Sequence, residues 1–128
     1  MTTLLLVEAD IIVRAPLGAY LRECGFRVLE AASSVEARSF LTNGSGTIEI
    51  VLADAQLKDE SGFALAAWIR SKWPDTQVIL AGSAEAATER AGKLCEEEPS
   101  VTRPYDHQLV LERIRRAAAA LERNKPKV

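Results

Sequence analysis

The chain has 128 residues, of which 48% are hydrophobic and 27% charged, and its formal net charge is −2. This length is typical of one domain that buries about two thirds of its unfolded surface without disulfide or metal support. The small net charge gives no field that would attract nucleic acid or an anionic membrane. The apolar runs are far shorter than the roughly 20 residues that span a bilayer, and residues 1–3 lack the charged start of a signal peptide, so we expect a cytoplasmic protein.

Strands and helices are predicted to alternate, which favours βα units around a parallel sheet. A first strand over residues 4–7 precedes a helix for which Asp10 is a suitable N-cap and Gly25 a suitable stop. The apolar residues of this helix recur at i, i+4, i+7, i+8 and i+11, which predicts one buried face: Val13, Leu17, Tyr20, Leu21 and Cys24. A second strand is predicted over residues 26–29.

The second helix is predicted from the capping-box spacing of Ser33 and Glu36. A third strand over residues 48–53 closes at Asp54. The third helix, over residues 62–72, is apolar almost all round, and its expected buried stripe is Phe63, Ala66 and Ile69, with Trp68 on the other side. The continuous apolar run over residues 77–81 predicts a fourth strand at the centre of a covered sheet.

The last part of the chain is predicted to form a fourth helix over residues 84–94, a short fifth strand around residues 100–102 and a final helix that begins near Asp106. Its expected buried face consists of Val110, Ile114, Ala117 and Leu121. Residues 124–128 have nothing apolar to bury, so we expect one domain over residues 1–123 followed by a flexible tail.

Two residue types with reactive side chains are expected to be structural. Cys24 and Cys95 lie on separate predicted helices and match neither a CxxC pair nor a zinc-ligand spacing, so we expect two reduced, packed thiols. His107 is the one histidine of the chain and falls in the first turn of the last predicted helix, where we expect it to be exposed and to bind no ligand.

Charged side chains stand at three predicted strand ends, where parallel α/β sheets place their chemistry. Glu8 follows the first strand, Asp54 closes the third, and Arg103 follows the fifth. Leu57 stands three residues after Asp54, and the pair Ser61-Gly62 begins seven residues after it. In order and spacing this pattern resembles the receiver domain of response regulators, and the resemblance covers residues 4 to about 121.

This resemblance implies an α/β fold of flavodoxin-like type, with a doubly wound five-stranded parallel sheet of order 2-1-3-4-5 flanked by five helices. It implies that Asp54 is the phosphoacceptor and that Mg²⁺ binds to Glu8, Asp54 and the backbone carbonyl of Gln56. Arg103 replaces the lysine that holds the phosphoryl group in the family, and its bond to Pro104 is a candidate cis peptide. In the resting state Arg103 could instead pair with Asp54 or Glu8.

Several positions depart from the family pattern. Ala9 replaces the second acidic residue after the first strand, so Mg²⁺ binding is expected to be weak; Asp10 is a substitute ligand, although its role as N-cap is favoured. Gly82 stands where the family has a threonine or serine, and the Ser83 hydroxyl could replace it from the next position. Ser100 and Lys58 stand where an aromatic residue and a proline are usual.

The leading hypothesis is a stand-alone, atypical receiver that accepts a phosphoryl group on Asp54 from a histidine kinase or phosphotransfer protein and signals to a downstream protein by contact; homodimerisation is left open. Its chemistry would be at most self-phosphorylation from a phosphodonor. The alternative is a pseudo-receiver that acts without phosphorylation. A flavodoxin-like nucleotide or flavin binder is a remote alternative, because neither GxGxxG nor GxxxxGK[ST] follows the first strand.

Overall fold

The computed structural model describes residues 1–44, 46–97 and 106–124. Its parallel sheet has the order β2-β1-β3-β4, as predicted for these strands: β1 Thr3–Val7, β2 Arg27–Ala31, β3 Ile50–Asp54 and β4 Gln77–Ala81. The helices are α1 Ile11–Glu23, α2 Ser34–Asn43, α3 Gly62–Lys72, α4 Ala84–Glu96 and α5 His107–Arg123. The predicted fifth strand lies outside the described residues, as does the predicted tail beyond Asn124.

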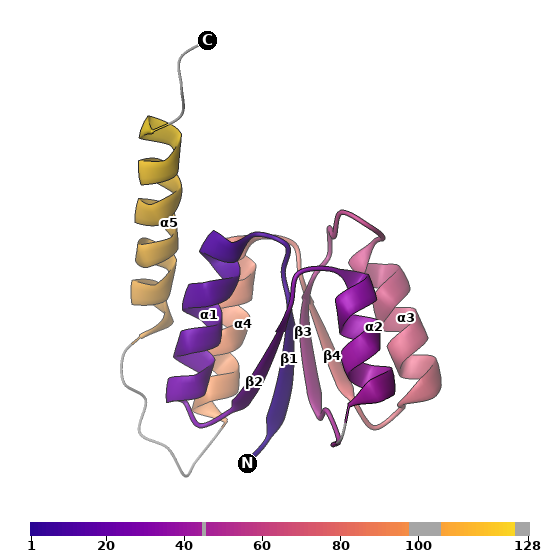
Figure 1. The fold of residues 1–128 in the computed structure, drawn as a ribbon. Helices are drawn as coiled ribbons and strands as arrows, with labels where there is room; N and C mark the ends of the chain where they lie inside the picture. Colours follow the sequence, from indigo (N-terminus) through magenta and orange to yellow (C-terminus); the bar gives the residue numbers. More distant parts are fainter. Residues whose placement is uncertain (45, 98–105, 125–128) are drawn as a thin grey trace.

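The sheet separates two apolar cores. Figure 1 shows α1, α4 and α5 on one side of the sheet and α2 and α3 on the other. Side chains alternate along β1, so Leu4 and Leu6 join the core under α1 while Leu5 and Val7 join the core under α2 and α3. All four side chains are buried, which explains why β1 is apolar from Leu4 to Val7. In the described part of the chain, no helix is both long and apolar enough to cross a membrane.

The sequence signals for α1 are confirmed. The Asp10 carboxylate accepts a hydrogen bond from the backbone N–H of Ile12 at 2.9 Å and so caps the first turn. Gly25 follows the last turn with φ of 99°, a left-handed conformation that favours glycine. The predicted buried face is buried throughout: Val13, Leu17, Tyr20, Leu21 and Cys24.

The predicted bounds of α3 are also confirmed, but its buried stripe is partly wrong. Phe63 is 67% exposed, whereas Ala66 and Ile69 are buried together with Leu65. Each residue of an α-helix turns the chain by about 100°, so a stripe centred on Leu65 and Ile69 leaves Phe63 toward solvent. The near-uniform apolar composition of α3 could not distinguish these two stripes.

The other side of α3 packs against α2 through Trp68. Its ring lies edge to face with Trp73, with the ring centroids 5.2 Å apart, and the guanidinium of Arg38 lies 4.4 Å from its centroid. Trp68 is therefore half-buried by the neighbouring helix, which accounts for an aromatic residue outside the main stripe.

Helix α5 differs most from its prediction. His107 lies against Gly92 in the second half of α4, and Arg115 reaches Glu85 at its start, at 3.7 Å, so the two helices run antiparallel. Only the first half of α5 packs on the domain, and Figure 1 shows its second half continuing past the ends of α1 and α4. The prediction that Ala117 and Leu121 are buried is therefore wrong: both are exposed.

Strand β4 is also less covered than predicted. Val78, Ile79 and Leu80 are half-buried: Ile79 packs against the core under α1, and Val78 and Leu80 pack against the core under α2 and α3. His107 is likewise not fully exposed, as its ring contacts α4 at Gly92, where a Cβ atom would come within 2.5 Å of Nδ1.

The two cysteines form a disulfide bond, contrary to the prediction of free thiols. Cys24 ends α1 and Cys95 lies in the last turn of α4, and their Cα atoms are 5.5 Å apart. Both side chains are buried in the core between these helices. The disulfide joins residues 71 positions apart, a pairing that cysteine spacing alone could not indicate.

The loop between β3 and α3 is held against the start of α2. The Asp59 carboxylate accepts hydrogen bonds from the N–H and hydroxyl groups of Ser34 and from the N–H of Val35, at 3.1, 2.7 and 3.1 Å. These bonds, above all the one from the Ser34 hydroxyl, lower the pKa of Asp59 from 3.8 to about 2. Beside them, Arg38 donates two hydrogen bonds to Oε1 of Glu60.

Loss of the disulfide is expected to destabilise the domain. In the chain-entropy account, opening a cross-link between residues 71 positions apart lowers the free energy of unfolding by about 2–4 kcal/mol. Urea unfolding of the wild type with and without dithiothreitol measures this difference. The Cys24→Ala/Cys95→Ala variant should match the reduced wild type and show no response to dithiothreitol. Alkylation of both thiols in the unreduced, denatured wild type would contradict the disulfide.

Asp59 is expected to stabilise the fold in a pH-dependent manner. Its folded pKa lies below the unfolded value, so its contribution is present above about pH 4 and is lost as the pH falls through about 2. Asp59→Asn should therefore lower the free energy of unfolding at pH 7, and the difference from wild type should shrink between pH 4 and 2. Guanidinium unfolding across this range tests it, with the exposed Asp75→Asn as control. Equal stability of Asp59→Asn and wild type at pH 7 would contradict a stabilising role of the hydrogen bonds that Asp59 accepts from Ser34 and Val35.

Candidate functional site

Two carboxylates meet at the carboxyl edge of the sheet because of the strand register. Val7 of β1 pairs with Ala53 of β3, so the residues that follow them, Glu8 and Asp54, lie at the same edge of the sheet. Both line one small cavity with Ser83, and its other walls are apolar: Leu6, Val7, Leu17, Leu52, Ala53, Ala81 and Ala87. The cavity volume of about 10 Å³ is that of one water molecule or one small ion.

Glu8 is held by its own turn. Its backbone N–H donates to the carbonyl oxygen of Ala31 at 2.9 Å, and its Oε2 atom accepts from the backbone N–H of Asp10 at 3.0 Å. Burial raises the pKa of Glu8 above its usual 4.5, and the negative charges of Asp54 and Asp10 raise it further. Glu8 and Asp54 are thus close enough to repel each other, a repulsion that a bound cation would relieve.

Asp54 presents one oxygen to its own loop and leaves the other available. Oδ1 accepts from the backbone N–H of Gln56 at 3.0 Å, while Oδ2 accepts no hydrogen bond within the described part of the chain. The loop then returns to Asp54: Gln56 bridges Ser61, and the Gly62 N–H donates to Ala55 at 2.9 Å. A Cβ atom on residue 62 would collide with the Asp54 carbonyl oxygen, which explains the glycine eight positions after the aspartate.

Two carboxylates at this cavity, those of Glu8 and Asp54, are available as metal ligands. Asp10 caps α1, as favoured from the sequence, and its side chain is engaged with Ile12. Among the described residues no group of three histidine, cysteine, aspartate or glutamate side chains could hold a metal. Two carboxylates with a backbone carbonyl and waters still suit Mg²⁺, which prefers oxygen ligands and commonly retains several waters.

The hydroxyl predicted to substitute at position 83 lies at the cavity. Ser83 is the N-cap of α4, and its Oγ accepts from the backbone N–H of Ala86 at 3.1 Å. Because the hydroxyl oxygen is the acceptor in this bond, the hydroxyl can still donate a hydrogen bond to a ligand. A Cβ atom built on Gly82 meets nothing within 4 Å, so close packing does not require a glycine at this position.

The structure describes only some of the other residues predicted at the site. Arg103 and its bond to Pro104 lie outside the described residues, as does Ser100. Leu57 is 9% exposed and anchors the loop after Asp54 in the core under α2 and α3, while Lys58 is exposed.

Sequence reasoning missed two residues that shape this edge. Asp59 clamps the loop after Asp54 onto α2, and Arg14 of α1 donates from Nη1 to the backbone carbonyl of Glu8 at 2.6 Å. Neither has a local motif, because Asp59 is bound 25 positions away and Arg14 is an ordinary polar residue of an amphipathic helix.

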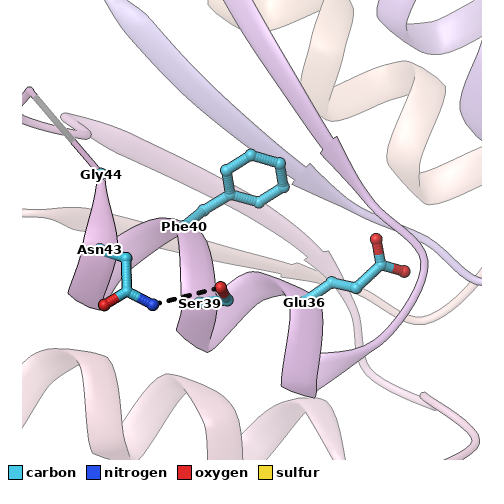
Figure 2. Close-up of a pocket in the computed structure, with 5 residues that line it drawn as sticks. All are labelled: Glu36, Ser39, Phe40, Asn43 and Gly44. Carbon is cyan, nitrogen blue, oxygen red and sulfur yellow. Dashed lines mark hydrogen bonds between the residues drawn. The ribbon is translucent and has the colours of Figure 1, made fainter.

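A larger hollow lies elsewhere. Figure 2 shows residues from successive turns of α2 and its C-cap that line a hollow of about 280 Å³, in which Asn43 donates to the Ser39 hydroxyl at 3.4 Å: Glu36, Ser39, Phe40, Asn43 and Gly44. It shares no residue with the cavity of Glu8 and Asp54, and its lining contains one carboxylate, whereas two carboxylates line the smaller cavity.

Known proteins resemble this chain in sequence. The transcriptional regulatory protein GltR of Pseudomonas aeruginosa is 36% identical over 69 residues, which cover 54% of this chain and 28% of GltR. The chain spans between 9% and 28% of the length of the curated relatives compared with it.

Solved structures resemble it in fold. The response regulator protein TrrA of Thermotoga maritima in complex with Mg²⁺–BeF is 30% identical, with a TM-score of 0.57 over 62% of this chain and 68% of that one. In the complex of TrrA with the histidine kinase ThkA, the matched chain is 26% identical, with a TM-score of 0.58 over 68% of this chain and 80% of that one.

The model of the response regulator receiver domain family matches residues 4–115. This range contains the four described strands apart from Thr3, the first residue of β1, and it contains both carboxylates of the cavity and Ser83. The sheet order, the helices on both faces and the acidic edge agree with that match, and the chain belongs to the response regulator receiver domain family.

Proposed function

We propose that Asp54 accepts a phosphoryl group from a histidine kinase or phosphotransfer protein, with Mg²⁺ held by Glu8, Asp54 and the Gln56 carbonyl. The observation that carries this proposal is the meeting of two repelling carboxylates and one hydroxyl around a cavity of ionic size. The receiver unit would comprise residues 1–123, with residues 124–128 as a tail, and it would signal by protein contact rather than by turnover of a substrate.

The transfer needs little from the protein beyond position and charge. Oδ2 of Asp54 would attack the phosphorus of a phosphohistidine, so that a P–O bond forms as the P–N bond breaks and the imidazole leaves with its electron pair. Mg²⁺ would offset the charge of the phosphoryl oxygens. Ser83 would donate a hydrogen bond from its hydroxyl to one of those oxygens, and Arg103 would supply the fixed positive charge that the family obtains from lysine.

Exposed apolar side chains around this edge support docking of a partner. Ile11, Val35 and Phe63 are 56, 68 and 67% exposed, and each lies in the first turn of its helix, at the end that faces the carboxyl edge of the sheet. A partner docked on this edge would cover these three side chains and remove their apolar surface from water. The solved complex of ThkA with TrrA is a histidine kinase bound to a protein similar to this chain.

A second function is favoured by two observations. Ala9 provides no carboxylate after β1, and Gly82 provides no hydroxyl after β4. A pseudo-receiver that binds its partner without phosphorylation would need neither group. The two functions differ in whether Asp54 takes up a phosphoryl analogue, which can be measured directly.

Beryllofluoride, an analogue of a phosphoryl group, is expected to bind at Asp54 in the presence of Mg²⁺. Fluorine NMR of the wild type should show a bound signal that depends on Mg²⁺ and is absent in Asp54→Asn. Half-saturation should require millimolar Mg²⁺, because one anionic ligand is missing at Ala9. If no bound signal forms even at tens of millimolar Mg²⁺ in a folded wild type, the pseudo-receiver is the better account.

Glu8→Gln is expected to make the domain more stable at neutral pH while abolishing the Mg²⁺-dependent signal. The folded pKa of Glu8 is raised, so its favourable contribution is present below about pH 4.5 and is lost as the pH rises through the raised value. The ionised carboxylate therefore costs stability at pH 7, a cost that glutamine removes. Urea unfolding at pH 7 and 4 measures the difference, with the exposed Glu49→Gln as control. A destabilised Glu8→Gln at pH 7 would contradict this interpretation.

A further inference from the structure

Arg14 joins the first turn of α1 to both neighbouring strands. Its side chain is 15% exposed, and Nη1 donates to the backbone carbonyl of Glu8 at 2.6 Å. Its Nε atom donates to Oε1 of Glu30 on β2 at 3.3 Å. One guanidinium therefore connects the turn after β1 to the adjacent edge strand.

Glu30 is fixed in turn from the other end of α1. Its second oxygen, Oε2, accepts from Nη1 of Arg22 at 2.9 Å, and Nη2 of Arg22 donates to the carbonyl of Val28 at 3.0 Å. Gly18 lies between the two arginines on α1, and a Cβ atom there would come within 3.0 Å of Oε2. Because Gly18 leaves this space open, the carboxylate of Glu30 fits between both cations.

The consequence concerns the position of Glu8. With Ala9 unable to contribute a carboxylate, Glu8 is the one acidic side chain that β1 brings to the cavity with Asp54. Its side chain is held by the backbone N–H of Asp10, two residues later in the same turn. Movement of the Glu8 carbonyl would thus displace both the turn and the Glu8 carboxylate. The negative charge of Asp54 already disfavours the ionised form of this carboxylate at its present position.

We propose that Arg14 is a positioning residue, which holds Glu8 opposite Asp54 through the Glu8 carbonyl and is itself fixed by Glu30. The proposal rests on the proposed function for its link to Mg²⁺, but the position of Glu8 can be tested without any ligand. Arg22 provides a matched control, since it also binds Glu30 and a strand carbonyl but does not touch Glu8.

The first measurement is amide exchange and chemical shift in the free protein. In Arg14→Ala the Asp10 amide, which donates to Glu8, should shift and should exchange faster than in wild type, while in Arg22→Ala it should remain unchanged. Arg14→Lys should lie between wild type and Arg14→Ala, because a compact ammonium cannot bind the Glu8 carbonyl and Glu30 with the geometry of a guanidinium. An Asp10 amide unchanged in Arg14→Ala and Arg14→Lys would overturn the proposal.

The second measurement is the Mg²⁺ dependence of the beryllofluoride signal. Arg14→Ala should raise the Mg²⁺ concentration at half-saturation by about tenfold or more, as is typical when the support of a metal ligand is lost, and Arg22→Ala should stay within about twofold of wild type. Equal weakening in both variants would overturn the proposal, since it would indicate a general loss of stability. If the wild type gives no signal, the proposed function fails, and the Asp10 amide alone then decides the role of Arg14.

Discussion

The pairing of β1 with β3 places two acidic residues at neighbouring strand ends, and the rest of the carboxyl edge is arranged around their repulsion. Glu8 and Asp54 follow directly from the register of Val7 with Ala53. The cost of this arrangement appears in the raised pKa of Glu8, to which burial contributes first and Asp54 contributes next among the charges. Stability alone would not select such a pair, whereas a cation that binds between them would benefit from both charges.

The surrounding residues restrain this edge from both sides. On one side, Arg14 binds the turn that carries Glu8 and links it to β2 through Glu30. On the other, Asp59 holds the loop after Asp54 on the N-terminus of α2, where unpaired N–H groups favour a negative charge. Arg14 binds the backbone carbonyl of Glu8, and Asp59 binds residues at the start of α2, so neither hydrogen bond uses the carboxylate of Glu8 or Asp54.

The helices on the two faces of the sheet are held in place by different kinds of contact. Under α2 and α3 the contacts are apolar packing, the edge-to-face contact of Trp68 with Trp73 and the cation–π contact of Trp68 with Arg38. On the other face a disulfide joins the ends of α1 and α4, and α5 packs on these helices through its first half. The protruding half of α5 leaves Leu121 exposed, so this helix has a surface that the described part of the domain does not cover.

The sequence by itself determined the order and type of the described elements, the N-caps Asp10 of α1 and Ser33 of α2, and the presence of acidic residues at two strand ends. These depend on residues within about four positions of each other or on the period of apolar side chains, which a sequence displays directly. Tertiary structure alone decided the Cys24–Cys95 bond, the clamp of Asp59 on Ser34 and the direction of α5 on α4. Each of these contacts joins residues at least 25 positions apart in the sequence. The spacing of neighbouring residues carries no information about such distant pairs.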